Sequence, residues 1–517
     1  MDFALGLRDY DLSLMQPHFP GYPVYIFISW LFFKLFHNEV WALVAPGVFF
    51  GSLTVYPLSF LVRQLFSERV AILTAILYII NPLCWLQAER PTSDAMGLFF
   101  IMLSTYFLYR VFAQNTQEIQ TTTEGSNCNM PRHVKSNRIR PDLLFRNFKS
   151  SSYNPPVYGR IQGGESRRPI LLFRSFNINV WCSNRKCLFL GSLTLGFGFG
   201  VRLSYFPFIA LWMGILFYLA TKRTHCKKHD ILYGLIGLFA GVFFWFFPQI
   251  GYTGWRPYFQ NGLSFSYGHF TDWGGSVITF GGLERIVCLA KSTWVYGLGG
   301  WWYDASFLRL IPSMIIVIPP FYFLKHYHFD RRELFLGLYV IPYLLWIVFG
   351  QNVANPRHIM PIIPIILIMI AYGLCKAHDK GYKVVSLFFM LALIVSMSAM
   401  SFKLVTQYHN NAPAPLQLIQ FIERQYNNIS TRIYCSDEKR FFDYYAPAWD
   451  VRKVRDRAEL NIDLNSSLGK PQDILLVHTP EEIKQFGIIR PPIIKFEGNA
   501  YMGSTRKVLM LYALTGF

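Results

Sequence analysis

The sequence has 517 residues, of which 52% are hydrophobic, 18% aromatic and only 15% charged. Together with a mean hydropathy of +0.27, this composition excludes an ordinary soluble protein and a disordered chain, and it indicates a polytopic membrane protein. The formal net charge of +19 does not predict nucleic-acid binding, because membrane proteins collect Lys and Arg in their cytoplasmic loops. The eight cysteines lack the spacing of a disulfide or metal framework.

The N-terminal segment combines acidic residues with a proline-rich turn. Asp2 and Asp9 precede His18 in the turn Gln-Pro-His-Phe-Pro-Gly-Tyr-Pro, and an apolar stretch follows from Tyr22 to Phe36. This stretch is short and carries a lysine, so we expect it to lie in the membrane interface rather than to cross. Ionisable groups at a membrane edge are costly unless they serve a function. Residues 1–40 are therefore predicted to form an external catalytic-type loop and an interfacial helix.

Ten later segments come close to the roughly 20 apolar residues that a membrane crossing requires. They form two blocks, 41–113 and 187–402. The predicted spans are 41–62, 70–88, 95–113, 187–201, 203–221, 231–250, 306–324, 333–350, 358–375 and 384–402. The weakest is 187–201, which is short and glycine-rich. If 187–201 and 203–221 are counted as two separate spans, most of the loop Lys and Arg residues fall on the same side of the membrane. By the positive-inside rule, this side is the cytoplasmic one.

Two regions outside the spans differ in composition. Residues 114–186 are rich in Ser, Thr, Asn, Arg and Pro, which predicts a poorly ordered cytoplasmic basic insertion. From residue 403 the hydropathy falls, and helical and extended patterns alternate: a helix at 415–426, strands at 432–435, 473–478, 492–496 and 507–512, and a helix start at 479–482. We expect 403–517 to form a small external α/β domain. The fold class is thus mainly α, a polytopic helical membrane protein with about ten spans.

Four groups of polar residues lie at the predicted external boundary. They are Asp2, Asp9 and His18 in the first loop, Glu89, Arg90 and Asp94 in the second, Arg202 after a glycine-rich span, and Arg357 with His358 before a late span. Arginine matches phosphate oxygens bidentately, and a carboxylate can take a proton from an incoming nucleophile. All four groups are predicted to lie on the same side of the membrane, and this shared position favours a binding site for a phosphate-bearing donor.

Each group also has a plain structural interpretation. Asp9 is explained by solvation of a loop, and His18 by capping of a turn. A local ion pair accounts for the second acidic loop, with Asp94 capping the next helix. Arg202 and Arg357 are also suited to reach lipid head groups.

The order of these motifs resembles the GT-C superfamily of integral-membrane glycosyltransferases, over roughly residues 2 to 402. The sequences Pro-Gly-Tyr-Pro, Glu-Arg-x-x-x-Asp, Gly-x-Arg and Asn-Pro-Arg-His-x-x-Pro carry it, and the protein O-mannosyltransferase-like and aminoarabinose-transferase-like enzymes are most similar. The resemblance implies transfer of a sugar from a polyprenyl-phosphate carrier to a glycan, lipid or protein acceptor on the external or luminal face. It leaves the need for a divalent cation open.

The resemblance also implies roles for particular residues. An external-loop aspartate, here Asp2, would be the general base beside His18, with Glu89 and Asp94 in the second acidic loop. The lipid phosphate would be held by Arg202 and Arg357, and the substrate site completed by Arg90, His358 and Asp9.

Relatives carry a transmembrane helix before this loop, with the aspartate slightly upstream of Phe-Ala-Leu. We expect either that Asp2 replaces that aspartate or that the helix and the base precede Met1. Two other functions stay open, a lipid-linked-sugar transporter and a non-catalytic membrane scaffold. Compact loops favour a bacterial plasma membrane.

Overall fold

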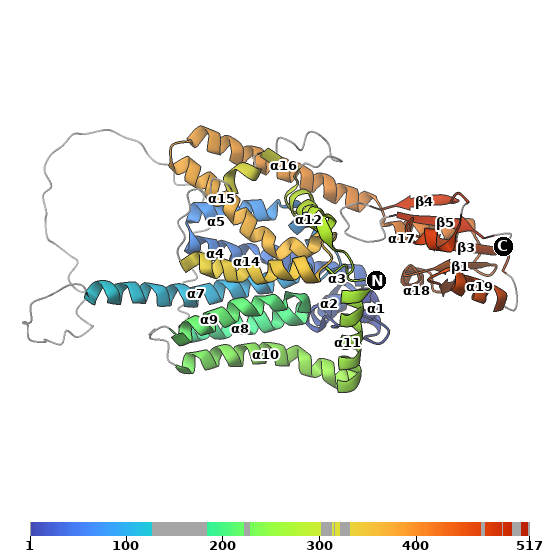
Figure 1. Cartoon of the computed structure of the whole chain (residues 1–517), viewed down its shortest axis with the longest axis horizontal. Helices are drawn as coiled ribbons and strands as arrows, with labels where there is room; N and C mark the ends of the chain where they lie inside the picture. Colours follow the sequence, from blue (N-terminus) through green and yellow to red (C-terminus); the bar gives the residue numbers. More distant parts are fainter. Residues whose placement is uncertain are drawn as a thin grey trace, which may run out of the picture.

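The computed structural model describes residues 2–126, 183–221, 228–300, 313–314, 316–320, 331–466, 471–488, 490–498 and 508–514. Most of its long helices run side by side, and a small domain with a β-sheet lies at one end of them (Figure 1). Both the N-terminus and the C-terminal domain lie at this end. We call it the external end, following the orientation that the basic loops predict.

The first elements lie at the external end of the bundle. Helix α1 covers Asp2–Arg8 and α2 covers Pro23–Phe36, and both are close to the C-terminal domain in Figure 1. The short α1 was not expected, because seven residues with a glycine carry too little periodicity to predict a helix. The apolar α2 is too short to cross a membrane.

The helices of the bundle alternate in direction between its two ends. In chain order they are α3 (Glu39–Leu53), α4 (Val55–Leu65), α5 (Glu68–Ile79), α6 (Pro82–Ala88), α7 (Asp94–Ser126), α8 (Asn184–Val201), the 3₁₀ turn η3 (Leu203–Phe208), α9 (Ile209–Thr221), α10 (Lys228–Thr253), α14 (Arg331–Gly350), the 3₁₀ turn η6 (Pro356–Ile362), α15 (Ile363–Asp379) and α16 (Lys383–Asn410). As a result, the C-terminal ends of α6, α8 and α14 all lie at the external end of the bundle.

The mainly helical, multi-pass membrane fold is confirmed. Within the described residues, seven helical segments are long and apolar enough to cross a membrane, or eight if the bent pair α5 and α6 is one span. The pair bends by 57° at Asn81-Pro82, where proline ends the hydrogen-bond ladder. The predicted span 187–201 forms α8, whose first turn is polar, and most of the predicted span 306–324 lies outside the described residues. The insertion 114–186 lies largely outside them as well.

Glycines bring α8 and α10 into close contact. A β-carbon at Gly196 would lie only 2.8 Å from the backbone nitrogen of Val242, so only glycine permits this approach. Small residues at helix crossings are typical of membrane bundles. Helix packing thus explains why the predicted span 187–201 is rich in glycine. The same packing fixes the position of Arg202, which follows α8.

Two helices at the external end, α11 (Trp255–Thr271) and α12 (Gly282–Lys291), were not predicted. In Figure 1, α11 lies across the ends of the bundle helices. Arg285 of α12 is buried and donates hydrogen bonds to carbonyl oxygens of Gly275, Phe280, Ile347, Val348 and Gln351. Three of these carbonyls belong to the last turn of α14 or follow it, so one guanidinium group ties α12 to the end of a bundle helix.

Replacing Arg285 by methionine is expected to lower the free energy of unfolding by about 2–4 kcal/mol. Unpaired buried carbonyls cost about 1–3 kcal/mol each, and water can satisfy some of them. Thermal unfolding of the purified protein in detergent measures the loss. The neighbouring exposed Glu284 provides the control, since Glu284→Gln removes a charge on the same helix without removing these bonds. Equal stability of the two variants would contradict the role given to Arg285.

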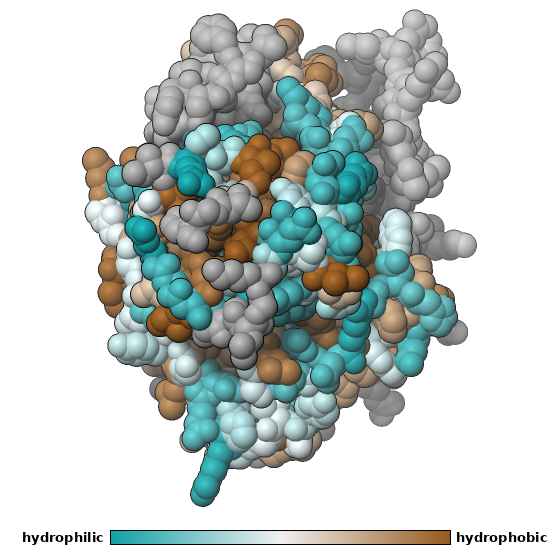
Figure 2. Space-filling model, turned by 90° about the vertical axis from the view of Figure 1, so that its right-hand side faces the viewer, coloured by the Kyte–Doolittle hydropathy of each residue, from teal (hydrophilic) through white to brown (hydrophobic). Residues whose placement is uncertain are grey.

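The C-terminal domain contains a five-stranded mixed sheet with strand order β2-β1-β3-β5-β4. β1 pairs in parallel with β2 and β3, and β5 pairs antiparallel with β3 and β4. Its elements are α17 (Ala414–Gln425), β1 (Thr431–Cys435), α18 (Lys439–Tyr445), β2 (Asp450–Lys453), α19 (Arg457–Ser466), β3 (Asp473–His478), the 3₁₀ turn η7 (Glu482–Phe486), β4 (Ile494–Glu497) and β5 (Val508–Ala513). The expected α/β composition is confirmed, whereas α18, β2 and α19 were missed. Seen from this end, the molecule presents many hydrophilic residues, with apolar residues between them (Figure 2).

Alternate residues of the strands build two small cores. Ile433 and Leu475 pack with Leu418 of α17 on one face of the sheet. Tyr434 and Leu476 pack with α19 and η7 on the other, as the two-residue period of a strand requires. The short β2 escaped prediction because it is a polar edge strand, Asp-Val-Arg-Lys, with none of its residues fully buried.

Candidate active site

A buried ion pair occupies the external end of the bundle. Asp94 is the first residue of α7, and Arg202 follows the last residue of α8. Arg202 Nη1 lies 3.1 Å from Asp94 Oδ1, and the two side chains are only 6% and 0% exposed. Arg202 Nη2 also lies 3.4 Å from His358 Nδ1 of η6. Three of the four predicted polar groups therefore contribute to one location.

Several polar atoms around this pair are buried without a hydrogen-bond partner in the described part of the chain. They include Asp94 Oδ2, Arg202 Nε, Gln87 Oε1, Thr92 Oγ1 and Ser93 Oγ. Native proteins leave few such atoms unsatisfied, and each one calls for an explanation. A polar ligand that enters between α6, α7 and α8 would supply the missing partners.

Two further arginines, Arg90 and Arg357, stand in the second predicted loop and at the start of η6. Burial lowers the pKa of Arg90, and the positive charge of Arg357 lowers it further. Neither guanidinium group forms an ion pair with a carboxylate among the described residues, and Arg357 Nε is buried without a hydrogen bond. The negative charge of Asp94 acts on Arg90 as well. Guanidinium groups of this kind are suited to bind the oxygens of an anion such as phosphate.

The first loop brings Asp2, His18 and Tyr22 together. His18 Nδ1 lies 2.9 Å from Asp2 Oδ2, and His18 Nε2 lies 3.0 Å from the Tyr22 hydroxyl. The His18 ring stacks on Phe265 of α11, with 5.5 Å between the ring centres and 15° between the planes. Burial would raise the pKa of Asp2, but the hydrogen bond and charge of His18 and the charge of Arg440 hold it well below its ordinary value.

Tyr22 connects this loop to the arginines. Burial raises the pKa of its hydroxyl, and the positive charges of Arg202 and Arg357 partly oppose the effect. The negative charges of Asp94 and Asp2 act on the same hydroxyl. The first loop and the arginine cluster thus belong to one electrostatic environment.

The C-terminal domain reaches this loop through α18. Arg440 Nη1 lies 2.6 Å from Asp2 Oδ1, and Arg440 Nη2 lies 3.0 Å from the sulfur of Met15. One turn further along α18, the Tyr444 ring lies under the Arg8 guanidinium at 4.4 Å. The domain therefore docks onto α1 and engages the predicted base directly.

The Asp2 contacts predict a particular pH dependence. A carboxyl group whose pKa is lower in the folded state stabilises the fold above its unfolded-state pKa of about 3.9, and this contribution declines as the pH falls towards the folded value. The difference in melting temperature between wild type and Asp2→Asn should therefore be positive at pH 5 and smaller at pH 3. Thermal unfolding at the two pH values measures it. A difference that grows in acid would contradict the assigned contacts.

Two predicted residues lie away from the cluster. Glu89 accepts a hydrogen bond from Trp85 Nε1 and lies 3.5 Å from His409 Nε2, at the external end of α16. Asp9 is exposed just after α1. The sequence-based argument missed Tyr22 and Arg440. The sequence gives a weak indication for Tyr22, which stands four residues after His18, between Gly21 and Pro23. It gives no indication that Arg440 belongs to the site.

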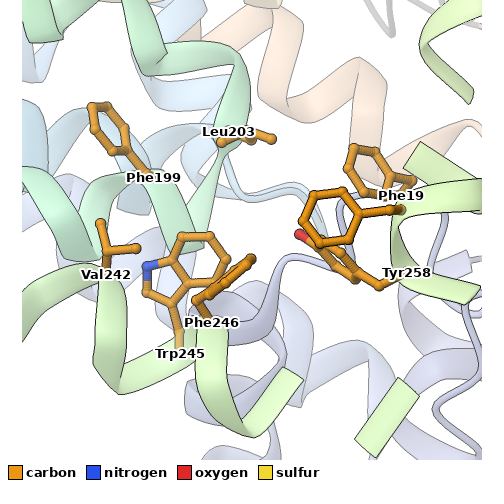
Figure 3. A pocket seen from close by; sticks show the side chains of 8 residues that line it. Phe19, Phe199, Leu203, Val242, Trp245, Phe246 and Tyr258 are labelled. Atoms are coloured by element: carbon orange, nitrogen blue, oxygen red, sulfur yellow. The ribbon is translucent and has the colours of Figure 1, made fainter. Parts of the chain in front are cut away.

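An apolar cavity adjoins the cluster. It has a volume of about 330 Å³ and is lined by Phe19, Phe199, Leu203, Val242, Trp245, Phe246, Tyr258 and Phe259 (Figure 3). Phe19 and Leu203 are the chain neighbours of His18 and Arg202, so the polar site and the apolar cavity share two segments of chain. Among the described residues, no group of three or more His, Cys, Asp and Glu side chains is arranged to hold a metal ion.

The fold defines a multi-pass membrane protein with a buried Asp94–Arg202 ion pair at the external end of its bundle. In sequence, residues 17–120 match the family of dolichyl-phosphate-mannose-protein mannosyltransferases. This match confirms the resemblance to GT-C glycosyltransferases over residues 17–120, and Asp2 and Asp9 of the first loop lie outside it. No curated protein matches the chain significantly in sequence.

Solved structures show similarity at low sequence identity. ArnT from Cupriavidus metallidurans bound to undecaprenyl phosphate is 12% identical, covers 95% of this chain and 87% of its own, and has a TM-score of 0.46. The apo oligosaccharyltransferase from Archaeoglobus fulgidus is 11% identical with a TM-score of 0.43. The match covers 92% of this chain, which spans only 65% of that protein. AglB from the same organism, in complex with an inhibitory peptide and a dolichol-phosphate, has a TM-score of 0.41 at 12% identity, with coverage of 92% and 65%.

Proposed function

We propose that this glycosyltransferase moves a sugar from a polyprenyl-phosphate carrier to an acceptor at the external face of a membrane. The observation that carries the proposal is that Arg90 and Arg357 act on each other as like charges, while neither forms an ion pair with a carboxylate among the described residues. Such a pair repels itself unless an anion binds, and arginine matches the oxygens of phosphate. Arg202 is held by Asp94 and completes the cradle from α8.

The apolar cavity suits the other part of this donor. Its wall is almost entirely aromatic and aliphatic, and it begins one residue away from Arg202. A polyprenyl phosphate combines an anionic head with an apolar chain, so its head would bind the arginines and its first isoprene units would fill the cavity. A free sugar phosphate or a nucleotide would leave the cavity empty.

The first loop supplies the proton-accepting group. Asp2 stays ionised because its pKa is lowered, and it orients His18 through Nδ1. A carboxylate and imidazole pair of this kind acts as a general base when a hydroxyl acceptor approaches. The phosphate then leaves on the opposite side of the sugar, and the arginines stabilise its developing charge.

Transfer assays with purified protein in lipid nanodiscs test the proposal. Polyprenyl-phosphate sugars with a radiolabelled sugar are the donors, mannose first, with protein, glycan and lipid acceptors. Wild type should release polyprenyl phosphate and label an acceptor, and Asp2→Asn should reduce the rate by about 10²–10⁴-fold. Asp9→Asn, which removes an exposed carboxylate from the same loop, should keep the wild-type rate. The proposal fails if wild type binds no polyprenyl phosphate and turns over none of these donors.

A further inference from the structure

Tyr22 has an unusual place in the chain. It precedes α2 with φ 49° and ψ 45°, in the left-handed region that residues other than glycine rarely adopt. Strained positions of this kind persist only where the surrounding structure enforces them, and they are frequent at functional sites. Here Phe3 of α1 contacts the Tyr22 ring edge-on, with 4.9 Å between the ring centres. The hydroxyl group is thereby directed at His18.

The carboxylate of Asp2 is already occupied on both oxygens. Oδ2 contacts His18 Nδ1, and Oδ1 contacts Arg440 Nη1. The cationic Arg440 makes this carboxylate a weaker base, and each of its oxygens already has a polar partner. Its position fits an orienting role better, because it fixes the tautomer of His18 with the hydrogen on Nδ1.

His18 in that tautomer has one acceptor left, Nε2, and this atom faces the Tyr22 hydroxyl at 3.0 Å. The ring is fixed between Phe265 on one side and Phe3 on the other, with centre distances of 5.5 Å and 6.1 Å. The imidazole therefore cannot turn Nε2 towards an acceptor without breaking both ring contacts. Tyr22 is the group that stands between His18 and the remainder of the site.

Val24, two residues after Tyr22, packs against Gly200, two residues before Arg202. The charges of Arg202, Arg357 and Asp94 also act on the Tyr22 hydroxyl. These residues surround the position proposed for the donor phosphate. An acceptor that attacks the sugar held there must bring its hydroxyl close to this end of the first loop. Tyr22 is then the described hydroxyl group that joins the donor side to the Asp2–His18 pair.

We propose that Tyr22 is a catalytic proton relay, an inference that rests on the proposed function. The acceptor oxygen forms a bond to the anomeric carbon, while the bond from this carbon to the phosphate oxygen breaks and its electron pair leaves on the phosphate. The acceptor proton moves to the Tyr22 oxygen as the Tyr22 proton moves to His18 Nε2. The imidazolium that forms is stabilised by Asp2, and it returns its proton to solvent after product release.

Tyr22→Phe in the full-length protein tests the relay, with polyprenyl-phosphate mannose as donor and water or a supplied hydroxyl compound as acceptor. The transfer rate should fall at least 100-fold, while the Kd for polyprenyl phosphate stays within about twofold, as expected for a group that acts on the proton alone. The control is Tyr10→Phe. Tyr10 belongs to the same loop, but its hydroxyl contacts Gln249 and the Gly21 carbonyl instead of His18, so this variant should stay within about threefold of wild type.

A proton inventory in mixtures of H₂O and D₂O separates a relay from a merely structural tyrosine. Two protons move together in the proposed step, so the plot of rate against deuterium fraction should curve for wild type and become linear for Tyr22→Phe. A near-wild-type rate for Tyr22→Phe would overturn the relay, as would equal losses of rate and of polyprenyl-phosphate binding. Failure of wild type to bind polyprenyl phosphate would refute the proposed function instead, and the relay with it.

Discussion

Replacing Arg202 by methionine is expected to destabilise the protein by about 3–5 kcal/mol, since removal of one partner from a buried ion pair leaves an uncompensated charge. Asp94 is 0% exposed, and its carboxylate lies 3.1 Å from Arg202. Among the described residues, Arg202 is the group that forms an ion pair with this carboxylate. Chemical or thermal unfolding in detergent measures the effect.

A double-mutant cycle shows whether the loss comes from the pair. Asp94→Asn in the Arg202→Met background removes the buried charge, so the double variant should be more stable than Arg202→Met alone. The exposed pair Arg69 and Asp379, with side chains 74% and 57% exposed, is the matched control. Breaking it should cost less than about 1 kcal/mol. Additive effects of Arg202→Met and Asp94→Asn would show that the two charges do not interact.

Replacing Arg90 or Arg357 by glutamine is expected to weaken polyprenyl-phosphate binding by about 10- to 100-fold each. A hydrogen bond to a charged group contributes about 1.5–3 kcal/mol, and 1.4 kcal/mol corresponds to a factor of ten in Kd. The same substitutions should not lower the thermal stability of the unliganded protein. Burial lowers the pKa of Arg90, and the positive charge of Arg357 lowers it further. Removal of one charge should therefore leave the empty protein as stable as wild type or more stable.

Competition binding with a short-chain polyprenyl phosphate in nanodiscs measures the affinity, and thermal unfolding without ligand measures the stability. Arg256→Gln is the control, because Arg256 is an exposed arginine of α11 at the same end of the molecule. It should change neither quantity. If Arg90→Gln destabilises the empty protein and keeps its affinity, the arginine has a structural role and the phosphate cradle is wrong.

The convergence of Asp94, Arg202 and Arg357 could be predicted from the sequence because each residue lies next to a predicted span. Hydropathy fixes where a span begins and ends, and alternating crossings fix which ends share a side. These two rules place the residues at one end of the bundle without knowledge of packing. They cannot show that Glu89, in the same loop as Asp94, turns to Trp85 and His409 instead.

The remainder of the candidate site depends on contacts that no local pattern encodes. Arg440 stands in a short helix of a polar domain, and nothing in its neighbourhood distinguishes it from the other surface arginines. Tyr22 acquires its partners only when α1, the proline-rich turn and α11 enclose the His18 ring. The α11 and α12 helices were not predicted, although α12 has a clear amphipathic pattern over its ten residues.

The contact between Arg440 and Asp2 joins residues separated by 438 positions. Ribosomes deliver the aspartate to the membrane early and the arginine late, after all the described bundle helices have been inserted. A nascent chain therefore carries Asp2 without this clamp until α18 has been translated. Docking of the C-terminal domain onto α1 is thus a late step of biogenesis, completed only after the described bundle helices have been made.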